Sequence, residues 1–175
     1  RCLTGLLLIL LAASLAACSS PAAPSETPVS TQADVVTFAD PLLEAMVRAA
    51  MNKPEGDITL AEAEAVAELK LSIDWQQEPA PDTQIKDISG LENFKNLEIL
   101  ELHFHAITDI SPLAGLTKLT SLSLGGNPVT DITPLAGLTS LGSLTLFNCQ
   151  AQDYTPLANL TGLGMLLLEY STISD

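Results

Sequence analysis

The sequence has few basic residues, few aromatic residues and few cysteines. Its 175 residues include 7 Lys and Arg against 21 Asp and Glu, which gives a formal net charge of −14. A nucleic-acid-binding protein needs a basic face to displace counterions from phosphates, so this charge argues against a nucleic-acid partner. Three cysteines are too few for the disulfide framework of a small secreted domain. Hydrophobic residues make up 47% of the chain, enough for one ordinary domain and too many for a disordered protein.

The first 17 residues predict an export signal. Arg1 precedes an apolar run at 3–11 and then small residues, which is the layout of a secretory signal peptide. The tetrapeptide Leu15-Ala16-Ala17-Cys18 resembles the lipobox of bacterial lipoproteins, in which the cysteine is acylated and the chain is cut just before it. The resemblance implies a bacterial protein exported and anchored to a membrane by a lipid on Cys18, at the cell surface or in the periplasm. An ordinary cleaved signal is the alternative.

Two further regions precede the bulk of the chain. Residues 18–37 are rich in Ser, Pro, Ala and Thr without an apolar period, and they predict a lipid-anchored flexible tether. Residues 38–65 predict a helical N-terminal cap. Asp40-Pro41 is a good start for one helix, and Thr59 with Glu62 forms a capping box for a second.

The remaining residues, 66–175, form the repeat region, and from residue 85 on they repeat at a shift of 22. Each of these units contains Leu-x-x-Leu-x-Leu, the leucine-rich-repeat signature, and three residues later a polar or small residue, while an earlier, longer unit begins with Val66-x-x-Leu69-x-Leu71. Because a unit of this length cannot bury its own leucines, the units must stack. We therefore expect an α/β solenoid with parallel strands on the concave face, short 3₁₀ or irregular returns on the convex face and the helical cap at one end. The columns include Leu97, Leu119, Leu141 and Leu163, and the turn residues His105, Asn127, Cys149 and Ser171.

The units resemble the internalin-type leucine-rich repeats of bacterial surface proteins. The resemblance is carried by ITDISPLAGLTKLTSLSLGGNPVTDITPLAGL and covers residues 85–175. It implies a binding module without catalytic residues, whose partners differ from one member to another. His105 departs from the pattern at a position that Asn127 fills in the next unit. An insertion at 75–84, which carries Trp75, follows the first strand. The chain stops within a unit, so we expect a truncated solenoid that self-associates through an uncapped end.

Catalytic and metal-binding patterns in the repeats are weak. Glu101, His103 and His105 have the i, i+2, i+4 spacing that brings ligands to one face of a strand, but His105 falls in the turn column and is expected to leave the strand direction. By strand spacing, Glu101 and Glu169 are about 14 Å apart, too far for a pair of glycosidase carboxylates. Cys149 has no histidine nearby to activate it. We therefore expect no enzyme, no metal site and no cofactor.

The variable positions between the inward leucines predict the binding surface. We expect a protein partner, or alternatively a glycan, to bind on the concave face, where small residues in the middle units would leave a shallow saddle. Aromatic side chains after the last core leucine act either as interface anchors or as covers for the strand ends. The predicted contacts are Glu101, His103, Phe104, Phe147, Asn148, Met165, Glu169 and Tyr170, with Trp75 in a flanking loop. The alternative function is a spacer or targeting fragment of a longer cell-envelope protein whose active domain lies downstream.

Overall fold

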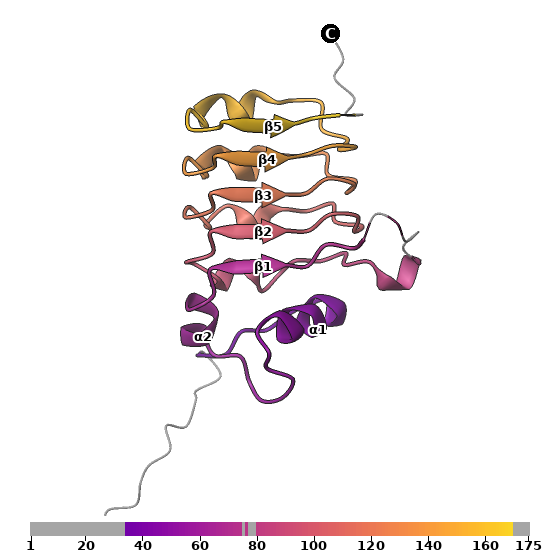
Figure 1. Ribbon diagram of the computed structural model, residues 1–175, viewed down its shortest axis with the longest axis vertical. Coiled ribbons are helices and arrows are strands. Elements are labelled where there is room, and N and C mark those ends of the chain that lie inside the picture. Colours follow the sequence, from indigo (N-terminus) through magenta and orange to yellow (C-terminus); the bar gives the residue numbers. More distant parts are fainter. Residues whose placement is uncertain (1–33, 75, 77–79, 170–175) are drawn as a thin grey trace, which may run out of the picture.

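The computed structural model describes residues 34–74, 76 and 80–169. Within them, five short strands form one parallel sheet in chain order (Figure 1). The strands are β1 (Glu68–Lys70), β2 (Ile99–Glu101), β3 (Ser121–Ser123), β4 (Ser143–Thr145) and β5 (Met165–Leu167). This arrangement confirms the predicted α/β solenoid of leucine-rich repeats.

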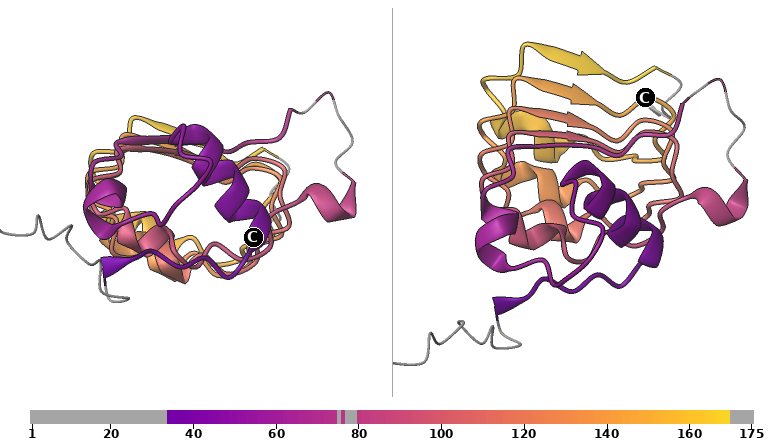
Figure 2. Two further views of the ribbon diagram at one scale, coloured as in Figure 1. Left: turned by 90° about the horizontal axis from the view of Figure 1, so that it is seen from below. Right: turned by 60° about the horizontal axis from the view of Figure 1, so that its bottom comes forward.

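Equivalent residues of successive units lie next to one another in the sheet. Leu100 pairs with Leu122, Leu122 with Leu144 and Leu144 with Leu166, each 22 residues further along the chain. Between β1 and β2 the pairing of Leu69 with Leu100 keeps the same register across a longer connection. That connection contains the insertion and a short 3₁₀ helix at Pro81–Thr83, which projects to one side of the stack (Figure 2). Trp75 lies outside the described residues.

The return segments contain 3₁₀ helices on the side opposite the sheet (Figure 2). In three of them a proline occupies the first turn, where its missing N–H costs nothing. Two residues before each of these helices an aspartate accepts a 2.8 Å hydrogen bond from the first helical N–H, as Asp109 does from Ser111. The four returns are Leu91–Asn93, Ser111–Leu113, Thr133–Gly137 and Thr155–Asn159.

Two helices cover the β1 end of the stack, α1 (Pro41–Ala50) and α2 (Leu60–Glu64). Asp40 caps α1 by accepting hydrogen bonds from the N–H groups of Leu42 and Leu43. Its second carboxylate oxygen accepts from the N–H groups of Lys86 and Asp87 in the first return. Burial raises the pKa of Asp40, but these four backbone donors outweigh it and hold the pKa below its usual value. One carboxylate therefore ties the cap to the repeats.

Residues just ahead of the predicted helical cap, 38–65, already pack with it. Val36 is buried, its N–H donates to the carbonyl of Ile58, and Val35 pairs with Thr59. Both valines fall within the segment that the sequence assigned to the tether. Val36 belongs to the same core cluster as Leu43 and Val47 of α1 and Ala63 of α2, so this part of the segment is packed with the cap. Within the described residues, no helix is long and apolar enough to span a membrane.

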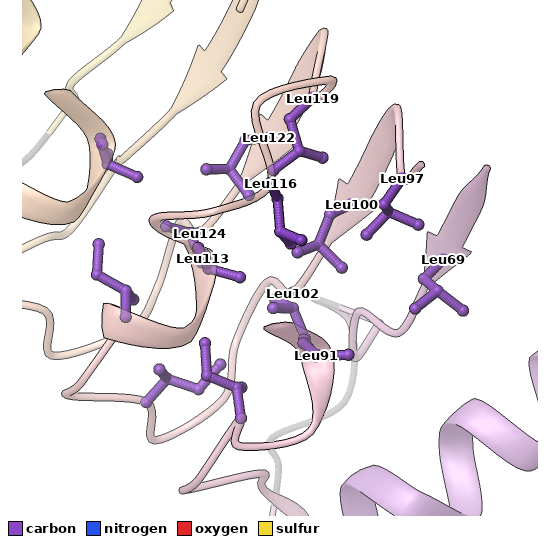
Figure 3. Packing of buried hydrophobic residues seen from close by; sticks show 14 of the residues in the cluster. Leu69, Leu91, Leu97, Leu100, Leu102, Leu113, Leu116, Leu119, Leu122 and Leu124 are labelled. Atoms are coloured by element: carbon purple, nitrogen blue, oxygen red, sulfur yellow. The ribbon is translucent and has the colours of Figure 1, made fainter. Parts of the chain in front are cut away.

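The inward leucines belong to one continuous core that extends from the cap to β4, and Figure 3 shows its leucines between Leu69 and Leu124. Leu100, Leu122 and Leu144 are fully buried because units lie on both sides of each. Their counterpart Leu166 is 41% exposed, since β5 has a neighbouring unit on one side within the described chain. The environment of a core leucine thus depends on the number of units that flank it.

We expect Leu122→Ala to lower the free energy of unfolding by about 2–5 kcal/mol, because it opens a cavity between two packed units. Leu166→Ala removes the same atoms from the same column but from a partly exposed site, and we expect a loss of less than about 1 kcal/mol. Urea unfolding of both variants measures the difference. Equal losses would contradict the stacking argument.

Candidate functional site

The outward side chains of the five strands form one surface, which we call the strand face. Along β1, β2 and β3 the burial alternates, so that Leu100 points into the core while Ile99 and Glu101 point outward. The same alternation places Ser121 and Ser123 outward on β3. This surface corresponds to the concave face predicted from the sequence.

Three rings meet directly after β2 and β4. His103 stacks on Phe147 with a centroid distance of 5.7 Å and an interplanar angle of 22°. Phe104 lies 5.4 Å from Phe147 and 6.2 Å from His103, both in tilted arrangements. All three side chains are half-buried. They form an aromatic cluster that keeps part of its ring surface exposed.

Two glycines of the intervening unit make room for this cluster. A Cβ atom on Gly125 would lie 2.1 Å from the ring of Phe147, and one on Gly126 would lie 2.7 Å from the ring of Phe104. The rings of the flanking units therefore lie across the glycines of the middle unit. The shallow saddle predicted for the middle units is filled at this edge by aromatic side chains. Of the two roles left open by the sequence, the structure shows the cover for the strand ends, while the part of each ring that stays exposed leaves the interface role a prediction.

The backbone turns sharply at the third residue after the end of each of β2, β3 and β4. Phe104, Gly126 and Asn148 share one column of the repeat, and all have positive φ, at 64°, 74° and 54°. Glycine and asparagine adopt this conformation at little cost, whereas a phenylalanine is strained there. The Gly and Asn in the same column were a signal for this turn that our sequence reasoning did not use.

The turn sends the next residue into the core. His105 is buried, its Nδ1 accepts a 3.2 Å hydrogen bond from the Ile85 N–H, and its Nε2 lies 2.6 Å from the Leu71 carbonyl oxygen. Asn127 makes the equivalent bonds one unit later, accepting from the Ile107 N–H and donating to the Leu102 carbonyl. His105 therefore replaces the asparagine rather than disturbing the turn, contrary to the irregularity that its departure from the pattern suggested.

The buried histidine also separates the three candidate metal ligands. Glu101 and His103 point outward from β2, while both ring nitrogens of His105 are engaged with the backbone on the inner side. Cys149 continues the turn column, with its thiol 2.9 Å from the Val129 carbonyl oxygen. Burial raises the pKa of this thiol and so disfavours the nucleophilic thiolate. His105 and Cys149 therefore stabilise the turns through contacts with backbone groups.

The other predicted contacts spread over the strand face. Glu101 is half-exposed on β2, and Asn148 is exposed after β4. Met165 is 53% exposed on β5, and Glu169 is exposed just beyond that strand. The structure thus gathers His103, Phe104 and Phe147 into one cluster and leaves Met165 and Glu169 on the last unit. Tyr170 lies outside the described residues.

Unfolding should depend on pH through His105. Burial lowers its pKa below 6.5, and the hydrogen bond to Leu71 only partly opposes this. The folded state therefore binds fewer protons than the unfolded state below about pH 6.5, so stability is full above that pH and falls as the pH decreases. The loss is at most about 1.4 kcal/mol per pH unit for one proton. We expect His105→Asn, which copies Asn127, to remove most of this dependence between pH 7.5 and 5.5 in urea unfolding.

The matched control is His103→Asn. Burial also lowers the pKa of His103, with Glu101 opposing, but this ring makes no hydrogen bond through Nδ1 in the structure. His103→Asn should retain the pH dependence of the free energy of unfolding that His105 contributes. An unchanged pH slope in His105→Asn would contradict the assignment of the slope to His105.

Comparisons with known proteins agree with this architecture. The family described as leucine rich repeats (2 copies) matches residues 117–159. Among proteins of curated function, none matched the chain.

Solved structures extend the likeness to most of the chain. An internalin (inlF) from Listeria monocytogenes shares 32% sequence identity over 79% of this chain, with a TM-score of 0.64. The chain spans 45% of that structure. Internalin C2 from the same organism shares 27% identity over 83% of this chain and 92% of its own, with a TM-score of 0.52. The likeness to a leucine-rich-repeat protein of Leptospira interrogans, at 22% identity, concerns the fold alone.

Proposed function

Because the chain is a bacterial internalin-like leucine-rich-repeat protein, we propose that it is an exported, lipid-anchored module that binds a protein partner through the strand face. Its architecture is that of a protein-interaction module. The proposal adds the surface used, the anchor on Cys18 and a location outside the cytoplasm.

The aromatic cluster is the observation that carries the choice of surface. Phe104 and Phe147 keep exposed ring area although their packing over Gly125 and Gly126 fixes their positions. Rigid aromatic side chains lose little conformational entropy on binding and supply large contact areas, so they are favoured as interface anchors. A strained Phe104, held where its column otherwise has Gly126 and Asn148, is further support for a functional role.

The arrangement also supports a role without catalysis. The buried His105 and Cys149 both contact backbone carbonyls, so neither side chain is available to a substrate at the strand face. Within that part of the molecule, no group of three His, Cys, Asp or Glu residues could hold a metal ion. We assign the strand face to recognition.

The chain enters the described domain at its cap end, which is compatible with a membrane tether attached there. Val35 pairs with Thr59 beside α2, at the cap end of the stack. A segment leading from Cys18 to Val35 therefore joins the domain at the cap and away from the aromatic cluster. This placement would hold the cap toward the membrane and leave the strand face accessible.

The surface assignment is tested with Phe104→Asn and Phe147→Ser in one variant. These residues occur in the same columns, at Asn148 and Ser72, so the fold should tolerate them. We expect partner capture from native envelope and surrounding proteins to fall at least about tenfold, because truncated anchors cost 2 kcal/mol or more. Quantitative pull-down with the unaltered chain as bait provides the measurement.

Thr117→Asn with Thr139→Ser is the matched control, since both threonines are exposed in the connections that lead into β3 and β4. The control should capture the partner as the unaltered chain does. Retention of the partner by the Phe104 and Phe147 variant, with its fold intact by circular dichroism, would refute the surface assignment.

The anchor is tested separately. We expect Cys18→Ala to abolish incorporation of radiolabelled palmitate and to release the protein from the membrane fraction, because a thiol on that residue is required for acylation. Cys2→Ala, a change within the predicted signal, should preserve both. Palmitate labelling of Cys18→Ala at the level of the unaltered chain would exclude this residue as the lipid site.

A further inference from the structure

The strand face changes its chemistry from β1 to β5. Two outward columns cross all five strands in register. Both are charged at β1, carry Ile99 and Glu101 on β2, are hydroxylic on β3 and β4, where Thr145 is largely buried, and are apolar on β5. The first column is Glu68, Ile99, Ser121, Ser143 and Met165, and the second is Lys70, Glu101, Ser123, Thr145 and Leu167.

At β1 and β2, the strand face carries more acidic than basic side chains. Glu68 forms an ion pair with Lys70, which leaves Glu101 and the exposed Glu98 at the start of β2. The ion pairs of the described chain are those of Arg48 with Glu44, Lys53 with Glu62 and Lys70 with Glu68, so neither remaining carboxylate is in a salt bridge. Lys70 also interacts electrostatically with Glu101, but a single cation beside Glu68, Glu98 and Glu101 leaves this end net negative, which favours a cationic partner group.

The opposite end is apolar. Met165 is 53% exposed and Leu167 is 38% exposed, whereas the residues in their columns on β3 and β4 are serine and threonine. Adjacent exposed apolar side chains on a sheet surface favour contact with an apolar group. The two ends of the strand face therefore favour different residue types.

The middle of the strand face is suited to a peptide backbone. Ser121, Ser123 and Ser143 are half-exposed, and their short side chains let a partner approach the sheet closely. Their hydroxyls both donate and accept, which matches the alternating N–H and C=O groups of an extended chain. The aromatic cluster limits this stripe along the strand ends.

We propose that the occupant of the strand face is an extended peptide segment of a protein, cationic at one end and apolar at the other, lying across the strands. Its Lys or Arg residues contact Glu98 and Glu101, and its apolar residues contact Met165 and Leu167. Four strand spacings of about 4.8 Å make the stripe about 19 Å long, which about six extended residues cover. The inference rests on the proposed function and names the class of partner.

The test is a selection of short random peptides on the immobilised full chain in mild detergent. We expect the enriched peptides to carry Lys or Arg near one end and Leu, Ile, Met or Phe near the other. Glu98→Lys with Glu101→Lys should weaken these peptides about tenfold and should select acidic peptides instead. Met165→Ser with Leu167→Ser, which copies the columns on the middle strands, should lose the apolar preference and keep the cationic one.

The control variant, Glu55→Lys with Asp57→Lys, changes the net charge by the same amount. Both residues are exposed in the loop between α1 and α2. This variant should bind the selected peptides as the unaltered chain does. Enrichment without a cationic preference, enrichment of nothing, or equal weakening in the control overturns the inference. A different result would refute the proposed function: the variant with changes at Phe104 and Phe147 would still bind the protein partner.

Discussion

The whole structure depends on the burial of leucines between units that cannot fold alone. Each unit offers one strand and a few apolar side chains, and Leu122 is fully buried only because β2 and β4 lie on either side of it. The in-register pairing of equivalent residues follows from this requirement, since a shift along the strands would separate the leucine columns. The strand face is consequently a by-product of the core, and its side chains are free to vary.

Backbone groups inside the stack impose a second constraint. Each turn leaves an N–H and a carbonyl of neighbouring units facing inward, where water cannot satisfy them. Asn127 satisfies both with one amide, and His105 does so with the two nitrogens of a neutral ring. The solenoid therefore tolerates different residues in this column, provided that they offer a donor and an acceptor at the right reach.

The repeat period and the inward leucines were sufficient to predict the solenoid and its parallel strands, and the capping residues Asp40 and Thr59 were sufficient to predict the helices of the cap. The placement of His103, Phe104 and Phe147 on the strand face also followed from their columns. Their mutual packing did not, since it depends on side-chain rotamers and on the space above Gly125 and Gly126. The role of His105 was equally hidden, because the motif names an asparagine and only geometry reveals that an imidazole can span the same two groups.

Contacts in a solenoid usually join neighbouring units, so that local opening at one unit needs to disturb only the next. The aromatic cluster breaks this rule, because His103 and Phe104 from the β2 unit contact Phe147 from the β4 unit across the glycines of β3. The three units are thereby coupled as a block. Opening the middle unit costs the ring contacts of both neighbours, which raises the cooperativity of unfolding around the aromatic cluster.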